Sequence, residues 1–226
     1  MENVITKEKA IDIMSRIDHT QLKAFATWED IKSLCDEAVL YKTASVCIPP
    51  DYVKKVKEAY ADTLKICTVI GFPLGYSTGA VKLFETENAL MQGADEIDMV
   101  INVTDVKNGD FNAVSNEIGA MRKVTANKIL KVIVETCYLT EKEKTELCHI
   151  VTDTGADYIK TSTGFGTAGA VIDDIKLFKE NIGPDVKIKA AGGIRTIEDA
   201  VAMVDSGADR IGSSAVAPLL WEIYCL

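Results

Sequence analysis

The five-residue pattern Gly-Ala-Asp-x-Ile occurs three times in this 226-residue chain, beginning at Gly93, Gly155 and Gly207. The spacings of 62 and 52 residues each fit two β/α units. Each glycine suits the end of a helix, where a positive φ turns the chain into the next strand. Because even-numbered strands of a barrel occupy equivalent positions, the repeat favours a closed (β/α)8 TIM barrel over an open doubly wound sheet, which stays the alternative.

Strand-like and helix-like segments alternate along the chain and predict one α/β domain over residues 1–226. Thr27, Thr140 and Thr196 each precede an acidic residue by three positions, which is typical of a capping box at a helix start. We predict a short N-terminal helix at 6–14 and strands at 16–20, 45–48, 65–71, 96–102, 129–136, 158–162, 187–191 and 210–213. We predict helices near 27–41, 50–60, 78–92, 110–125, 140–154, 170–181, 196–206 and 215–223.

The composition limits which partners are expected. No apolar run approaches the roughly 18 residues of a membrane helix, and the N-terminus lacks a signal-peptide pattern, so we expect a cytoplasmic protein without a membrane partner. The net charge of −9 argues against nucleic acid as a main partner. The six cysteines show no Cys-x-x-Cys spacing and are expected to be separate reduced thiols.

Three charged residues fall on the inward register of predicted strands: Lys160, Lys189 and Asp98. A lysine inside a barrel is costly unless it is paired or needed as a neutral amine. For one such lysine, a structural ion pair is the commoner explanation. Two lysines and an aspartate on three strands favour a catalytic group, because barrel active sites lie at the C-terminal ends of the strands.

A lysine attacks a carbonyl carbon only as the free amine. At the ordinary pKa of about 10.4, roughly one lysine in two thousand is unprotonated at pH 7. Lys189, as a nearby cation, would lower the pKa of Lys160, and Asp98 would accept or relay a proton. A metal site is not predicted, since the only two histidines, His19 and His149, lie 130 residues apart.

Glycine-bearing turns at three predicted strand ends are candidates for binding a phosphate. Those after strands seven and eight lie where barrels commonly bind phosphate through backbone N–H groups. Each turn alone is more often a tight connection. Asp18 and Cys47 are further candidates at the barrel mouth, although a small buried hydrophobe explains Cys47 better. The turn residues are Thr163, Gly164, Gly192, Gly193, Gly212, Ser213 and Ser214.

Over nearly its whole length the chain resembles the deoxyribose-phosphate aldolases, a family of metal-independent class I aldolases on (β/α)8 barrels. The segment Lys-Thr-Ser-Thr-Gly-Phe at 160–165 is a specific part of the resemblance. The other matching segments are 17–20, 46–49, 70–75, 96–102, 189–195 and 210–212.

The resemblance implies reversible cleavage of 2-deoxy-D-ribose 5-phosphate to D-glyceraldehyde 3-phosphate and acetaldehyde, without a cofactor. By that likeness Lys160 forms the Schiff base, Lys189 tunes it and Asp98 takes part in proton transfer. Asp18 would support this network and Cys47 would line the pocket. The seven turn residues named above match positions that contact the substrate and its phosphate.

Two departures from the family pattern concern the same site. Phe165 stands where some relatives carry a lysine, so phosphate binding is expected to depend more on backbone groups and on Arg195. Some relatives end in a tyrosine that reaches the site, and whether Tyr224 replaces it stays open.

Two other functions remain open at this stage. One is a different Schiff-base barrel enzyme, such as a transaldolase or a class I sugar-bisphosphate aldolase. The other is a non-catalytic binder of phosphorylated metabolites. A homodimer is a further expectation, since barrel exteriors often associate.

Overall fold

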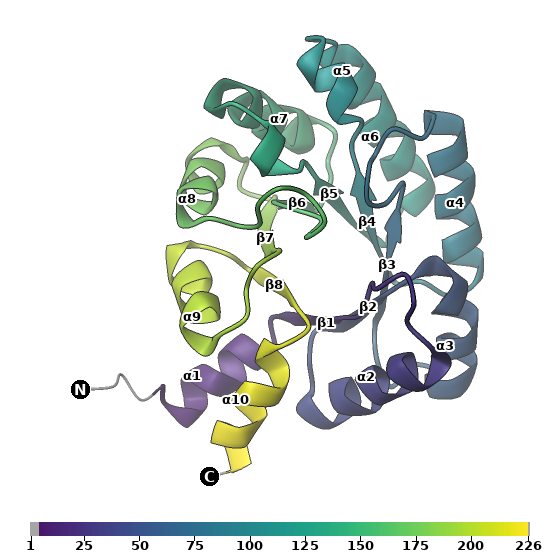
Figure 1. Cartoon of the computed structure of the whole chain (residues 1–226). Coiled ribbons are helices and arrows are strands. Elements are labelled where there is room, and N and C mark those ends of the chain that lie inside the picture. The colour runs from purple at the N-terminus through teal and green to yellow at the C-terminus, as the bar shows by residue number, and fades with distance from the viewer. Residues whose placement is uncertain (1–4, 226) are drawn as a thin grey trace.

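The predicted barrel is confirmed by the computed structural model, which describes residues 5–225. Eight parallel strands pair in chain order, and β8 pairs with β1 to close the sheet. Figure 1 shows the strands around the centre and the helices in a ring outside them. The strands are β1 (Ile17–Thr20), β2 (Ser45–Ile48), β3 (Ile66–Ile70), β4 (Glu96–Val100), β5 (Ile129–Ile133), β6 (Tyr158–Lys160), β7 (Lys187–Ala191) and β8 (Arg210–Ser213).

The helices also follow the prediction, and the three expected capping boxes are all present. A short α5 was not predicted; the Asn102 side chain accepts the N–H of Thr104 and starts this helix where the strand was expected to continue. The 3₁₀ turn η1 (Pro50–Tyr52) forms the first part of the helix predicted near 50–60, whereas the 3₁₀ turn η2 (Thr136–Tyr138) was not predicted. The α-helices are α1 (Lys7–Met14), α2 (Trp28–Tyr41), α3 (Val53–Tyr60), α4 (Gly79–Met91), α5 (Val103–Lys107), α6 (Phe111–Thr125), α7 (Glu141–Asp153), α8 (Ile172–Asn181), α9 (Ile197–Ser206) and α10 (Val216–Cys225).

The Gly-Ala-Asp-x-Ile repeat joins the end of a helix to the next strand in the same way each time. The three glycines have positive φ, as expected. In each copy the aspartate carboxylate accepts a backbone N–H from the preceding strand, which fixes the start of the even-numbered strand beside it. The three bonds join Asp95 to Ile66, Asp157 to Leu130 and Asp209 to Ile188, at 3.2, 2.7 and 2.9 Å.

The apolar core lies between the barrel and its helices. The isoleucine of each repeat copy belongs to it: Ile97, Ile159 and Ile211 are fully buried. Since side chains alternate along a strand, the neighbouring residues of these strands point into the barrel. No helix in residues 5–225 is both long and apolar enough to cross a membrane.

The inside of the barrel is filled by layers of four side chains, each layer drawn from alternate strands, as strand register in an eight-stranded barrel requires. Most members of the layers are polar, so the barrel interior is a charged core. From the N-terminal end of the strands, the layers are Ser45, Glu96, Tyr158 and Arg210; then Asp18, Cys67, Lys131 and Lys189; then Cys47, Asp98, Lys160 and Gly212.

Candidate active site

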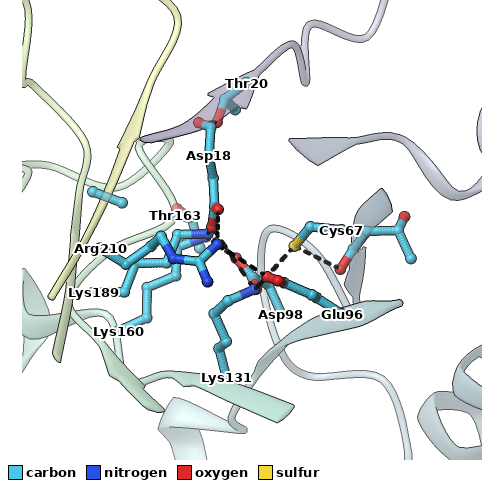
Figure 2. Close-up of polar contacts among 12 residues, drawn as sticks. Asp18, Thr20, Cys67, Glu96, Asp98, Lys131, Lys160, Thr163, Lys189 and Arg210 are labelled. Atoms are coloured by element: carbon cyan, nitrogen blue, oxygen red, sulfur yellow. Dashed lines mark hydrogen bonds and ion pairs between the residues drawn. The ribbon is translucent and has the colours of Figure 1, made fainter. Parts of the chain in front are cut away.

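Asp98 brings the three predicted catalytic residues together. Its Oδ2 lies 2.7 Å from Lys160 Nζ and 2.6 Å from Lys189 Nζ. Its Oδ1 lies 2.8 Å from Nζ of Lys131, which the sequence analysis did not single out. Figure 2 shows these side chains, from β4, β5, β6 and β7, meeting inside the barrel. The carboxylate of Asp98 is therefore the common partner of three lysines.

Asp18 extends this network from β1. Its Oδ2 lies 2.5 Å from Lys189 Nζ, and its Oδ1 accepts bonds from Arg210 at 2.5 Å and from Ser45 at 2.7 Å. Asp18 is fully buried. It therefore contacts the network from below and does not line the mouth.

Sequence reasoning missed four members of this network: Lys131, Glu96, Arg210 and Cys67. Lys131 carried the same signal as Lys160, a lysine on the inward register of an apolar strand, but strand five has no glycine-bearing turn after it. Glu96 forms an ion pair with Lys131, with 2.6 Å between Oε2 and Nζ. Glu96 and Arg210 occupy the variable position of the repeat and are the first residues of β4 and β8.

The network holds more cationic groups than carboxylates. Lys131 contacts three carboxylates, whereas Lys189 and Arg210 each contact two. Lys160 contacts one, Asp98. Four cationic side chains thus face three carboxylates, and Lys160 is the one of the four with the fewest ion pairs.

Burial and the ion pairs act in opposite directions on the buried groups. Burial would raise the pKa of Asp98, but attraction to Lys131, Lys160 and Lys189 outweighs it and holds that pKa well below its usual value. Burial would lower the pKa of Lys189, yet attraction to Asp18 and Asp98 raises it above the ordinary lysine value. Asp98 therefore stays an anion and Lys189 a cation over the physiological pH range.

The barrel mouth contains a cavity of about 390 Å³ above this network. Lys160 lines it, while Lys131 and Lys189 lie fully buried beneath. Lys160 is thus the lysine of the three that a molecule in the cavity can reach. The predicted turn residues Thr163, Gly164, Gly192, Gly193, Gly212, Ser213 and Ser214 all line the same cavity, together with Arg195 and Phe165.

Close backbone contacts shape the turns around the cavity. A Cβ at Gly169 would lie 2.2 Å from the carbonyl oxygen of Gly192, so this approach requires glycine. The Ser213 hydroxyl donates to Ile194 O and accepts the N–H of Val216, so it caps α10. The glycines of these turns line the cavity with backbone alone, which suits an anion.

The cysteine and histidine residues considered in the sequence analysis do not line the cavity. Cys47 is buried with Cys67 and Val69 in a small cluster below the mouth, where a hydrogen bond from Cys67 lowers the pKa of its thiol. His19 is buried outside the barrel, with Nε2 2.8 Å from Glu37, and His149 is exposed on α7. All six cysteines are free.

Tyr224 lies away from the mouth. Its ring stacks on Trp221 at 4.9 Å on α10, and it contributes to a groove with α1 and α2. In this structure it does not take the place of a terminal tyrosine at the site.

Two groups of side chains have donors close enough for a metal ion: Cys47, Cys67 and Asp98, and Asp18, Cys67 and Glu96. The carboxylates of both groups already hold lysine or arginine cations. Lysine and arginine side chains therefore occupy the places beside these carboxylates.

A buried lysine that lines a cavity at the mouth of a (β/α)8 barrel, with a carboxylate at its amine, is suited to attack a carbonyl carbon as class I aldolases do. The chain belongs to the DeoC/LacD family of aldolases, whose model matches residues 9–215.

Relatives with assigned names resemble nearly the whole chain. A deoxyribose-phosphate aldolase of Clostridium botulinum (strain Alaska E43) is 58% identical over 209 residues, covering 92% of this chain and 95% of that protein. One from Clostridioides difficile is 56% identical over 208 residues, with the same two coverages. The solved tetrameric deoxyribose phosphate aldolase of Aeropyrum pernix is 34% identical, with a TM-score of 0.87 over 96% of this chain and 92% of that one.

Replacing Asp98 by asparagine should destabilise the protein in a pH-dependent way. At pH 7 we expect a loss of about 3–5 kcal/mol in the free energy of unfolding, because buried lysines lose their shared anion. The depressed pKa of Asp98 contributes stability above its unfolded value of about 4, and this is lost as the pH falls. The gap between wild type and variant should therefore narrow below about pH 4.

Urea denaturation from pH 7 to pH 2.5 measures this gap. Asp185→Asn removes an exposed carboxylate in the α8–β7 loop and is the matched control, expected to change stability by less than about 0.5 kcal/mol. A gap for Asp98→Asn that stays constant across the acid range would contradict the assigned ion network.

Proposed function

We propose that the chain cleaves 2-deoxy-D-ribose 5-phosphate reversibly to D-glyceraldehyde 3-phosphate and acetaldehyde through a Schiff base on Lys160. The observation that carries the proposal is that Lys160 lines the cavity and has one carboxylate partner, while the neighbouring lysines are locked in several ion pairs. The names of the clostridial relatives support the same substrate.

The chemistry begins with attack of Lys160 Nζ on the aldehyde carbon of the open-chain sugar phosphate; loss of water gives an iminium. The C2–C3 bond then breaks and its electron pair moves toward the iminium, while the C3 hydroxyl loses its proton and becomes the aldehyde of the departing triose phosphate. Protonation of the resulting enamine at carbon and hydrolysis release acetaldehyde and restore the amine.

The neighbours of Lys160 have separate roles in this proposal. Lys189, held as a cation by Asp18 and Asp98, disfavours a second ammonium group at Lys160. Asp98 lies 2.7 Å from the amine and moves protons to and from the reacting atoms, directly or through water. Gly164, Gly192, Gly193, Gly212, Ser213 and Ser214 bind the phosphate mainly by their backbones, with Arg195 nearby.

The partner assignments follow from the same site. We infer a phosphorylated sugar and aldehydes as the ligands, no nucleic acid or membrane partner, and a cytoplasmic location. The net charge of −9 supports the absence of nucleic acid and membrane partners, since a protein of that charge repels polyanions outside a local binding site.

Borohydride reduction in the presence of acetaldehyde should attach an ethyl group to Lys160. The reduction converts the imine to a stable secondary amine, and peptide mass mapping locates it. Lys131 and Lys189 should stay unmodified because they are fully buried. A metal chelator should leave the adduct unchanged.

The same protein should turn over 2-deoxyribose 5-phosphate. An unmodified Lys160 in a folded protein would favour a non-catalytic binder. Turnover of a ketose phosphate with none of deoxyribose phosphate would indicate a different Schiff-base aldolase.

Lys189→Leu should reduce activity more at neutral than at alkaline pH. Without this cation, Lys160 needs a higher pH to be present as the free amine. The profile of kcat/KM from pH 6 to pH 10 measures the shift, which we expect toward higher pH. An unchanged profile with lower activity at every pH would count against a tuning role for Lys189.

We propose that the chain forms a homodimer through α4 and the loop before it. Five large apolar side chains are exposed there, more than half of each accessible. They are Leu74, Tyr76, Val81, Phe84 and Met91.

Light scattering should give twice the mass of a single chain, and Phe84→Glu should give the mass of one chain with the fold retained. A wild type that stays at the mass of one chain at high concentration would contradict the dimer.

A further inference from the structure

Glu135 follows β5 and has a backbone conformation unusual for its residue type. Its φ of 56° lies in the left-handed region, which side chains other than glycine, asparagine and aspartate rarely adopt. On either side of it, the N–H groups of Val134 and Thr136 bond to the carbonyls of Lys160 and Thr161. The two donors are two residues apart in the sequence, whereas the two acceptors are adjacent. One extra residue, Glu135, is therefore inserted on its side of the pairing, which is the pattern of a β-bulge.

The bulge directs the carboxylate of Glu135 onto the turn that follows Lys160. Its two oxygens accept the backbone N–H of Thr163 at 3.2 and 3.3 Å, and one of them also accepts the Thr163 hydroxyl. The Thr163 hydroxyl oxygen in turn accepts the N–H of Phe165 at 3.0 Å. Glu135 thus fixes both Thr163 and, through it, the far side of Gly164.

The carboxylate is 3% exposed, and no lysine or arginine of residues 5–225 forms an ion pair with it. A buried anion without a cation is costly unless hydrogen-bond donors surround it. The donors here are the N–H and hydroxyl of Thr163, with a longer contact of 3.9 Å from the Cys137 thiol. The returning chain also passes close by, since a Cβ at Gly166 would lie 3.2 Å from Glu135 Oε1. Because the shorter bonds all come from Thr163, displacing the turn would remove most of the hydrogen bonding that offsets the burial of this carboxylate.

These bonds also redefine the part that Thr163 plays. The sequence analysis predicted Thr163 as a substrate contact, but its N–H and its hydroxyl proton are both donated to Glu135. Gly164, with a φ of 86°, is left to present its backbone to the cavity. Thr163 therefore connects Glu135 to the turn.

We infer that Glu135 is a positioning residue for the phosphate group of the substrate: it acts through Thr163 to hold the Thr163–Phe165 turn in a phosphate-binding shape. This inference rests on the proposed function for the identity of the substrate. The Glu135 carboxylate bonds to Thr163 and Cys137, whereas the Lys160 amine is held separately by Asp98.

Glu135→Gln keeps the size of the side chain but offers an amide N–H₂ to donors that need an acceptor. We expect kcat/KM for 2-deoxyribose 5-phosphate to fall roughly tenfold or more, mainly through KM, because the phosphate-binding turn is displaced. For unphosphorylated 2-deoxyribose the change should stay within about threefold, since Lys160 is held by another network. Borohydride trapping of acetaldehyde on Lys160 should be retained.

Glu117→Gln is the matched control: it removes a buried carboxylate that pairs with Lys82, away from the mouth, and should leave the ratio of the two substrates unchanged. Thr163→Val gives a second test. If Glu135 acts through Thr163, the double variant should lose no more phosphate preference than the more impaired single variant. Equal losses for both substrates, or a fully additive double variant, would overturn the inference.

Calorimetric titration with glycerol 3-phosphate keeps this test separate from the aldolase assay. A wild type that binds this phosphate without cleaving deoxyribose phosphate would refute the proposed function alone. A Glu135→Gln variant that binds it as tightly as wild type would refute the positioning role, whatever the wild type catalyses.

Discussion

The carboxylate of Asp98 is the contact on which the site depends. Three lysines from three strands point at its two oxygens within 2.6–2.8 Å. Three ammonium groups at this distance would repel one another strongly in a dry interior without an anion between them. Asp98 therefore makes the arrangement possible. The network then has one positive charge in excess when all its members are ionised.

The register of the barrel strands places the three lysines around Asp98. Layers drawn from alternate strands place residues far apart in the sequence at one height, so Asp98 and Lys160 share a layer while Lys131 and Lys189 share the layer below. The lower pair is sealed from the cavity and the upper lysine is open to it. A one-residue change of register in β6 would turn Lys160 to the helix side and bring Ile159 inside. The register of β6 therefore decides whether the Lys160 side chain can reach the cavity.

Much of this was predictable from the sequence, because the barrel leaves periodic signals. The repeat and the capping boxes gave the fold, and the inward register gave Lys160, Lys189 and Asp98. Strand ends were less predictable: the strand expected to reach residue 102 ends at Val100, where Asn102 caps α5. Lys131 was detectable by the same inward register but belongs to a strand without a glycine turn. The bonds from Thr163 to Glu135 had no signal in the sequence, since a bulge depends on pairing between two segments that local sequence does not encode.

The carboxylates of Asp98 and Glu135 are both buried near Lys160, but they have different kinds of partner. Asp98 is surrounded by cations, so its charge is coupled to the protonation of the reacting amine. Glu135 accepts its hydrogen bonds from neutral donors, mainly the N–H and hydroxyl of Thr163, so its charge is coupled to the shape of a turn. A change at Asp98 alters which groups carry protons, whereas a change at Glu135 alters where backbone N–H groups point. Because the two anions share no partner, a substitution at one should leave the contacts of the other in place.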